Sequence, residues 1–195
     1  MNKRTSYMQS SFKTRAEPGE AEGGKKYIEG YFVVFNQRTE LWPGFFEEID
    51  PAAFNGSLND NDVRCLYNHT DNIVLGRTGN KTVTLTPDAH GLWGEIEINQ
   101  NDAEAMNAYA RIDRGDVCGC SFGFIPTAEE RIELPDGSVL YRVKEADLRE
   151  VSPCTFPAYP QTEIQARRAD YEAARKRSAE GRISEIKNRL EKLKC

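Results

Sequence analysis

A serine and a histidine that lie far apart along the chain are the residues that could do chemistry together. Ser121 lies in an apolar run between Gly119 and Gly123, and His69, one of two histidines in 195 residues, follows the apolar segment 65–67. A serine hydroxyl becomes a nucleophile when an imidazole removes its proton, and the ordinary pKa of histidine, about 6.5, suits this step at neutral pH. The pair is the minimum needed for nucleophilic acyl transfer.

A histidine that acts as a base needs an acceptor on its second ring nitrogen, which fixes the tautomer and stabilises the imidazolium. Glu150, in the predicted strand 148–155, is the first choice for this third catalytic position, and Asp147 is the second. A buried carboxylate needs a partner, so the guanidinium of Arg77 is a structural alternative to His69 as the neighbour of Glu150.

Alternation of side chains along a strand predicts which residues share a face. Strict alternation places Leu148 and Ser152 on the same face as Glu150. It also places Cys120 on the face opposite to Ser121, so the two side chains would not act in one site.

The five cysteines are odd in number and scattered. Cys118 and Cys120 form a C-x-C pair, which has neither the zinc-knuckle nor the thioredoxin spacing. We therefore expect reduced thiols, no metal site and no cofactor. Cys118, Cys120 and Cys154 also suggest an alternative enzyme, a cysteine protease with Cys120 as nucleophile. Buried free cysteines, however, more often serve as small apolar side chains.

Each candidate residue also has an ordinary structural explanation. Ser121 could donate a hydrogen bond to a neighbouring carbonyl within a strand, and His69 could be a surface-turn histidine. His90, which lies in a hairpin turn next to Gly91, is better explained as a turn residue. Two other functions therefore stay open: a non-catalytic β-barrel scaffold or binding module, and an esterase or amidase with a small substrate.

The elements that must position these residues are mostly short strands. Segments rich in aromatic and β-branched residues predict strands at 27–35, 45–49, 63–67, 82–86, 92–98 and 148–155, with one more containing Ser121. Residues 131–143 are predicted to form a hairpin around the turn Pro135-Asp136-Gly137. An N-cap pattern predicts a short helix that opens at residues 50–51 and a second helix over 101–112. Many strands with few helices indicate an α+β domain, built on a mainly antiparallel β-barrel or sandwich.

Composition divides the chain into three predicted parts. Residues 1–26 are polar and lack periodicity, so we expect a flexible segment before a folded domain at 27–164. Residues 165–195 hold ten Lys and Arg against five Asp and Glu, and a short apolar repeat indicates a basic helical or disordered tail. The remaining residues carry a net charge of 16 − 26 = −10, which argues against a dedicated nucleic-acid module.

The chain has no apolar run of about eighteen residues, so we expect no membrane span. Its start, residues 1–15, is basic and polar and lacks the apolar segment of a secretory signal. A cytoplasmic location is therefore expected.

The order of short motifs between about residues 27 and 162 resembles that of the prohead (capsid maturation) proteases of tailed phages. The motifs are, in order, Tyr31-Phe32-Val33-Val34-Phe35, Ile49-Asp50-Pro51-Ala52-Ala53-Phe54, Leu66-Tyr67-Asn68-His69-Thr70, Leu75-Gly76-Arg77-Thr78, Asp88-Ala89-His90-Gly91-Leu92-Trp93, Cys120-Ser121-Phe122-Gly123-Phe124 and Leu148-Arg149-Glu150-Val151-Ser152, followed by Pro157-Ala158-Tyr159-Pro160.

This resemblance implies a serine endopeptidase, similar to the herpesvirus assemblins, on a mainly antiparallel β-barrel surrounded by a few helices. Its substrates would be the major capsid protein, scaffold segments and the enzyme itself, inside an assembling prohead in the host cytoplasm. Ser121 matches the nucleophile and His69 the base, while Glu150 takes the acidic third position. A homo-oligomer is compatible with the resemblance, because the assemblins are dimers.

The chain departs from the assemblins at the oxyanion site. Assemblins place a pair of arginines there, whereas this sequence has Pro157-Ala158-Tyr159-Pro160 after the last predicted strand. Backbone N–H groups are the natural substitute. The basic tail is expected either to dock on an acidic scaffold helix or to be a solvated, cleavable extension.

Overall fold

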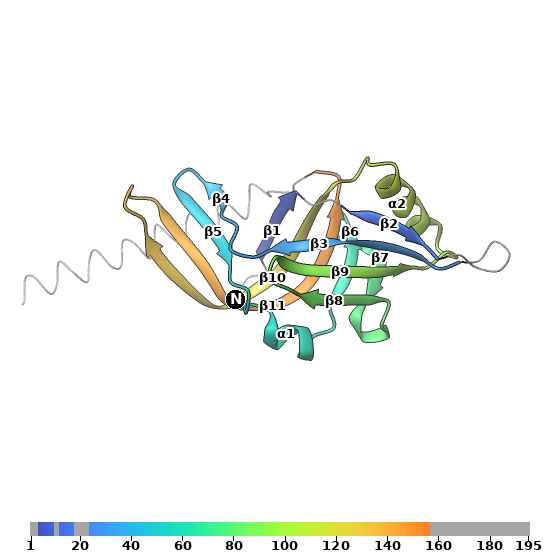
Figure 1. Cartoon of the computed structure of the whole chain (residues 1–195), viewed down its shortest axis with the longest axis horizontal. Coiled ribbons are helices and arrows are strands. Elements are labelled where there is room, and N and C mark those ends of the chain that lie inside the picture. Colours follow the sequence, from blue (N-terminus) through green and yellow to red (C-terminus); the bar gives the residue numbers. More distant parts are fainter. Residues whose placement is uncertain (1–3, 10–11, 18–23, 157–195) are drawn as a thin grey trace, which may run out of the picture. The chain divides into compact units, whose positions relative to one another are not determined.

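The computed structural model describes residues 4–9, 12–17 and 24–156, whose strands form two sheets (Figure 1). The seven-stranded sheet has the order β1 (Arg4–Gln9), β10 (Gly119–Glu133), β11 (Val139–Cys154), β5 (Phe45–Ile49), β4 (Thr39–Trp42), while β6 (Arg64–Tyr67) pairs with β11 and with β7 (Thr70–Arg77). The four-stranded sheet has the order β2 (Lys13–Ala16), β3 (Lys26–Val34), β9 (Gly91–Ile98), β8 (Val83–Pro87). The helices are α1 (Asn55–Asp60), the 3₁₀ turn η1 (Thr78–Asn80) and α2 (Ala103–Asp113).

The predicted mixture of many strands and few helices is therefore correct, but the barrel is not found. Among the described residues the strands form two separate open sheets. The long strand β11 explains the difference: its first half pairs in parallel with β5, and its second half pairs in parallel with β6. The edge of β11 opposite β10 is thus divided between two short parallel partners, instead of one strand that would close a ring.

The core lies between the two sheets. Phe32 of β3 and Leu92 of β9 are fully buried, as is Phe124 of β10. Phe124 stacks on Phe122 with ring centroids 5.4 Å apart, and Phe54 packs edge-on against both rings. Aromatic side chains of this size dominate core energetics, so this cluster fixes one face of β10 against the other sheet.

Helix α2 forms as the sequence predicts. The Asp102 side chain accepts hydrogen bonds from the N–H groups of Glu104 and Ala105, and Gly115, at φ 84°, follows the helix where a left-handed residue is favourable. The other helix was predicted to open at residues 50–51, but α1 begins only at Asn55. Asp50 instead accepts a hydrogen bond from the N–H of Ala52, which makes a local turn before the helix.

The N-terminal segment contains strands where the sequence predicted none. β1 pairs antiparallel with β10, and β2 pairs antiparallel with β3. The sequence predicted neither β4 nor β7, whereas the segment predicted as a hairpin at 131–143 is the tip of the long β10–β11 hairpin. Within the described residues no helix is long and apolar enough to cross a membrane. The predicted tail at 165–195 lies outside the described residues.

Candidate active site

The candidate site lies on one face of the β10–β11 hairpin, near the end where β11 finishes. In the antiparallel register Ser121 is opposite Ser152, and Gly123 is opposite Glu150. Side chains that face each other across such a pair point to the same side of the sheet. Ser121, Ser152 and Glu150 are all buried, although none of them joins the apolar core cluster. Because Gly123 has no side chain, nothing from β10 competes with Glu150 for this face.

An irregularity in the register corrects the predicted pattern of faces. Gly123 pairs with Glu150, but the next residue of β10, Phe124, pairs with Leu148, so Arg149 is an extra residue in β11. A bulge of this kind shifts the alternation by one residue. Leu148 therefore belongs to the apolar core instead of sharing the face of Glu150, as strict alternation predicted. The bulge lets β11 bury apolar side chains on one face and still present Glu150 on the other.

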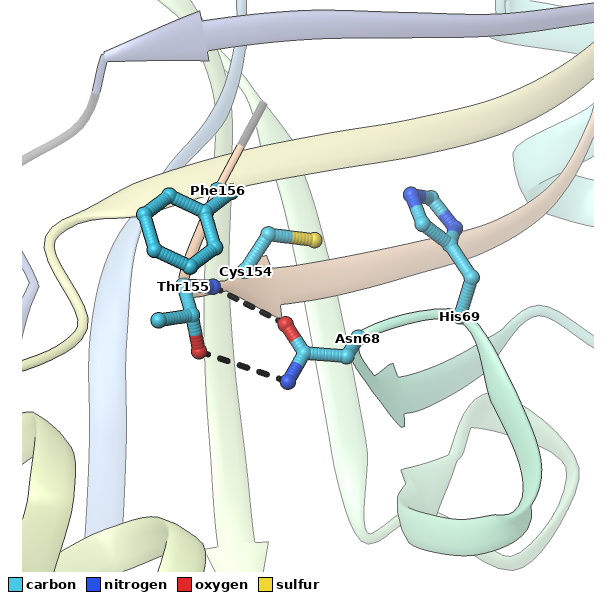
Figure 2. A pocket seen from close by; sticks show the side chains of 5 residues that line it. All are labelled: Asn68, His69, Cys154, Thr155 and Phe156. Carbon is cyan, nitrogen blue, oxygen red and sulfur yellow. Dashed lines mark hydrogen bonds between the residues drawn. The ribbon is translucent and has the colours of Figure 1, made fainter. Parts of the chain in front are cut away.

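His69 reaches this face from a tight turn between β6 and β7. Asn68 and His69 have φ values of 51° and 57°, the left-handed pair that closes a two-residue hairpin. The Asn68 side chain holds the turn against the end of β11: its Oδ1 accepts from the N–H of Thr155 at 2.9 Å and its Nδ2 donates to the Thr155 hydroxyl (Figure 2). The Asn68 N–H also donates to the carbonyl of Pro153. His69 is thus held beside β11 by its neighbour in the turn.

Glu150 lies between His69 and Ser152. The His69 Nδ1 atom is 2.6 Å from Glu150 Oε1, and the Ser152 hydroxyl donates to Glu150 Oε2 at 2.5 Å. A carboxylate can only accept, so the Nδ1 atom of His69 carries a proton in this arrangement. In a neutral imidazole the Nε2 atom is then the unprotonated nitrogen, which is the form that a general base requires.

The serine hydroxyl and the histidine are not joined in this structure. Ser121 is fully buried, and its hydroxyl donates to the backbone carbonyl of Ser6 at 2.8 Å. Ser6 belongs to β1, the strand that covers the outer edge of β10. Among the described residues the buried Nε2 atom of His69 has no hydrogen-bond partner. The structure therefore brings Ser121, Glu150 and His69 to one face without the serine–histidine bond, and their catalytic roles stay predictions.

A model of the caudovirus prohead serine protease family matches residues 10–177. The chain belongs to this family. The prohead protease of Enterobacteria phage HK97 is 30% identical over 148 residues, which cover 74% of this chain and 61% of that protein, so the chain spans only part of its relative's length. The structure of the bacteriophage T4 capsid assembly protease is similar over 76% of this chain and 98% of its own, with a TM-score of 0.43 and 14% identity.

Other groups that the sequence analysis considered lie elsewhere in this family member. Asp147, the second choice for the acidic position, is partly exposed and pairs with Arg149 at 3.2 Å. Arg77, the structural alternative as neighbour of Glu150, donates to Asp62. Glu150 is therefore the carboxylate that lies against His69.

The cysteines next to the site are poor nucleophiles. Cys120 lies on the core face, and its thiol approaches the backbone carbonyls of Tyr31 and Phe32. Burial, and then the charge of Glu150, raise the pKa of Cys154 to about 12, so this thiol stays protonated at neutral pH. Cys118 is exposed, and all four cysteines in the described part of the chain are free thiols. These observations argue against Cys120 as a nucleophile.

A pocket of about 340 Å³ opens next to His69, lined by Asn68, His69, Cys154, Thr155 and Phe156 (Figure 2). The Cys154 side chain points toward the histidine in Figure 2, whereas Phe156 lies at the other side of the pocket and is 80% exposed. Within the described residues no group of three His, Cys, Asp or Glu side chains is arranged to hold a metal.

Sequence reasoning missed three contributors to this site. Ser152 was placed on the right face but was given no role, although a hydroxyl two residues after an acid on one strand is within reach of it. Asn68 was overlooked, although asparagine before His69 is typical of a left-handed turn. Ser6 could not have been found, because its segment has no strand periodicity in the sequence.

Proposed function

We propose that this protein is a serine endopeptidase that cleaves capsid and scaffold protein during maturation of a phage prohead. The family membership supports this function, since the matching model describes prohead serine proteases. The single structural observation that carries it is the hydrogen bond between His69 and the buried Glu150, on the face of the hairpin where Ser121 lies. Glu150 and Ser152 of β11 and Ser121 of β10 are all buried on this face, where each is hydrogen-bonded.

The proposed mechanism follows from these three side chains. The Ser121 hydroxyl attacks a peptide carbonyl carbon while Nε2 of His69 takes its proton. His69 then protonates the leaving amine, which releases the first product and leaves an acyl-enzyme that water hydrolyses. Glu150 accepts the Nδ1–H of His69 throughout, which keeps the tautomer and stabilises the imidazolium that forms.

We propose the major capsid protein and its scaffold segment as substrates, together with the protease itself. The enzyme would work inside the assembling prohead in the host cytoplasm. The relative from phage HK97 is named a prohead protease, and the similar phage T4 structure is named a capsid assembly protease. The name of the phage HK97 relative supports a substrate found within the immature shell.

Replacement of Ser121 tests the function most directly. Ser121→Ala should abolish cleavage of a tailed-phage capsid precursor and labelling by a fluorophosphonate, a probe that reacts only with an activated serine. Ser57→Ala is a matched control, because Ser57 is also buried and also donates its hydroxyl to a backbone carbonyl, that of Phe54 at 3.2 Å. If Ser121→Ala still trims the precursor at the wild-type rate, the proposal is wrong.

One observation favours a second candidate, a non-catalytic scaffold or binding module. The Ser121 hydroxyl donates to the Ser6 carbonyl, as an ordinary structural serine would. This candidate predicts that no serine of the wild-type protein is labelled by the fluorophosphonate under any condition, including conditions that displace β1. The same probe therefore separates the two candidates.

A further inference from the structure

We infer that β1 occupies the place of a substrate strand, so that the chain's own N-terminal segment competes with substrate for the edge of β10 beside Ser121. This inference rests on the proposed function, and it concerns access to the same site. The partner that fits this edge is an extended polypeptide, because β1 itself is one.

The position of β1 carries the first step. β1 pairs only with β10 among the described strands, and it is the outermost strand of its sheet. Its register places Tyr7 opposite Ser121 and Ser6 opposite Phe122. A peptide that adds to a sheet edge makes the same backbone ladder as a strand of the protein. A substrate that approaches Ser121 along β10 would therefore meet β1 already in that position.

The hydrogen bond of the nucleophile carries the second step. Ser121 donates its hydroxyl proton to the carbonyl oxygen of Ser6 instead of to His69, and it is fully buried. The Nε2 atom of His69, which should receive this proton, is buried and lacks a hydrogen-bond partner within the described residues. A buried acceptor without a partner is unfavourable. While β1 is paired with β10, the hydrogen bond from the Ser121 hydroxyl to Nε2 of His69, which the reaction needs, is therefore not formed.

The attachment of β1 carries the third step. Beyond its ladder with β10, its described charged contact is Arg4, which pairs with Glu129 (Nη2 to Oε2, 2.9 Å) and lies 3.8 Å from Glu47. The side chains of Arg4 and Glu129 are each 25% exposed. An ion pair of this kind changes an equilibrium by a factor of only about 1.5 to 5. An edge strand held in this way can leave while the core between the two sheets stays intact.

These three observations give the segment a defined role. While β1 is paired, Ser121 is shielded from substrate and from His69. When a peptide takes its place, the hydroxyl is released from the Ser6 carbonyl and can turn toward the imidazole. The apparent affinity for substrate is then reduced by the fraction of molecules in which β1 is displaced.

Ser6→Pro in the full-length protein is the main test, because proline fixes φ at about −65°, far from the value of about −140° that an antiparallel strand needs. Thr84→Pro is the matched control, since Thr84 lies inside β8, the outermost strand of the other sheet. We expect the fluorophosphonate to label Ser121 more than about tenfold faster in Ser6→Pro if β1 covers over nine tenths of wild-type molecules. Thr84→Pro should label at the wild-type rate.

A milder pair of variants serves if Ser6→Pro does not fold, as judged by circular dichroism. Glu129→Gln removes the partner of Arg4 and should raise labelling by about 1.5- to 5-fold. Glu97→Gln, which removes an exposed ion pair with Lys25 in the four-stranded sheet, should leave labelling unchanged. Equal or slower labelling in folded Ser6→Pro, or no increase in Glu129→Gln, would overturn the inference.

Failure of the inference differs from failure of the proposed function. If the wild type is labelled and cleaves substrate as fast as Ser6→Pro does, β1 is not a competitor but the peptidase stands. If Ser121 is labelled in none of the proteins and none of them cleaves a capsid precursor, the peptidase and the competing strand are both wrong.

Discussion

Around Ser121 and Glu150, the two faces of the β10–β11 hairpin are equally buried but chemically opposite. One face presents Phe122 and Phe124 with Val151 to the other sheet, and these side chains belong to the apolar core. The other face presents Ser121 and Glu150, each almost completely buried as well. Burial of the first set removes apolar surface from water, at about 25 cal/mol per Å². Burial of the second set costs free energy unless each polar atom is paired.

This difference indicates where the hairpin is built for stability and where it is built for chemistry. On the apolar face, any apolar side chain that fills the same volume would stabilise the hairpin. On the polar face Glu150 accepts from both His69 and Ser152, so one substitution removes a donor from a buried carboxylate. We therefore expect variants on the apolar face to lower the free energy of unfolding, and variants on the polar face to lower activity per folded molecule.

Glu150→Gln should have the largest effect. An amide in the place of the carboxylate can donate to Nδ1 of His69, which favours the wrong tautomer, and such a change lowers kcat by about 10⁴-fold in a comparable triad. The measurement is the rate of precursor cleavage per folded molecule, with the melting temperature recorded in parallel. A loss of less than about tenfold would point to a serine–histidine dyad or to Asp147.

Phe124→Ala tests the opposite face. The ring is fully buried and packs against both Phe122 and Phe54, so its removal should lower the free energy of unfolding by about 3–5 kcal/mol. Urea denaturation measures this value, and cleavage by the folded fraction should stay near that of the wild type. If Phe124→Ala instead lost activity without losing stability, the division between the two faces would be wrong.

Ser152→Ala should have an intermediate effect on activity. A hydrogen bond to a charged group is worth about 1.5–3 kcal/mol, so loss of the bond to Glu150 Oε2 should lower kcat by roughly 10- to 100-fold with little change in KM. Ser152→Thr keeps the hydroxyl and should restore most of the rate. Restoration distinguishes positioning of Glu150 from a merely structural role.

Ser138→Ala is the matched control for this variant. Ser138 also donates its hydroxyl to a carboxylate two residues earlier, Asp136, at 2.6 Å, but in the turn between β10 and β11. Its replacement should leave kcat unchanged. Equal losses in Ser138→Ala and Ser152→Ala would mean that neither hydroxyl acts through the site.

The contrast between the faces also explains what the sequence could predict. Strands with alternating apolar residues, such as β8 and β9, and the capped helix α2 were predicted within one or two residues, because local pattern and burial agree there. The polar face was predicted only in part. Ser121 and Glu150 could be placed on strands, but their register depends on the extra residue at Arg149, which no local pattern reveals.

The N-terminal strands show the limit of the sequence most clearly. Residues 4–9 contain one aromatic and one methionine among polar residues, so their composition predicts no strand. They are ordered by pairing with β10, a partner more than a hundred residues away. Such non-local pairing is set by the rest of the fold, and for this reason the contact between Ser6 and Ser121 could not be foreseen.

The smallest expected effect concerns the thiol beside the polar face. In a Cys195→Ser background, iodoacetamide at pH 8 should modify exposed Cys118 quickly and spare Cys154, because burial and then Glu150 raise the pKa of Cys154 to about 12. Its thiolate, the reactive form, becomes appreciable only as the pH rises toward that value. Glu150→Gln removes the second cause but not the first, so Cys154 should become only a few-fold more reactive, as mass spectrometry of the alkylated peptides can measure. Rapid modification of Cys154 in the wild type would mean that the polar face is open to water, and the contrast of two equally buried faces would then fail.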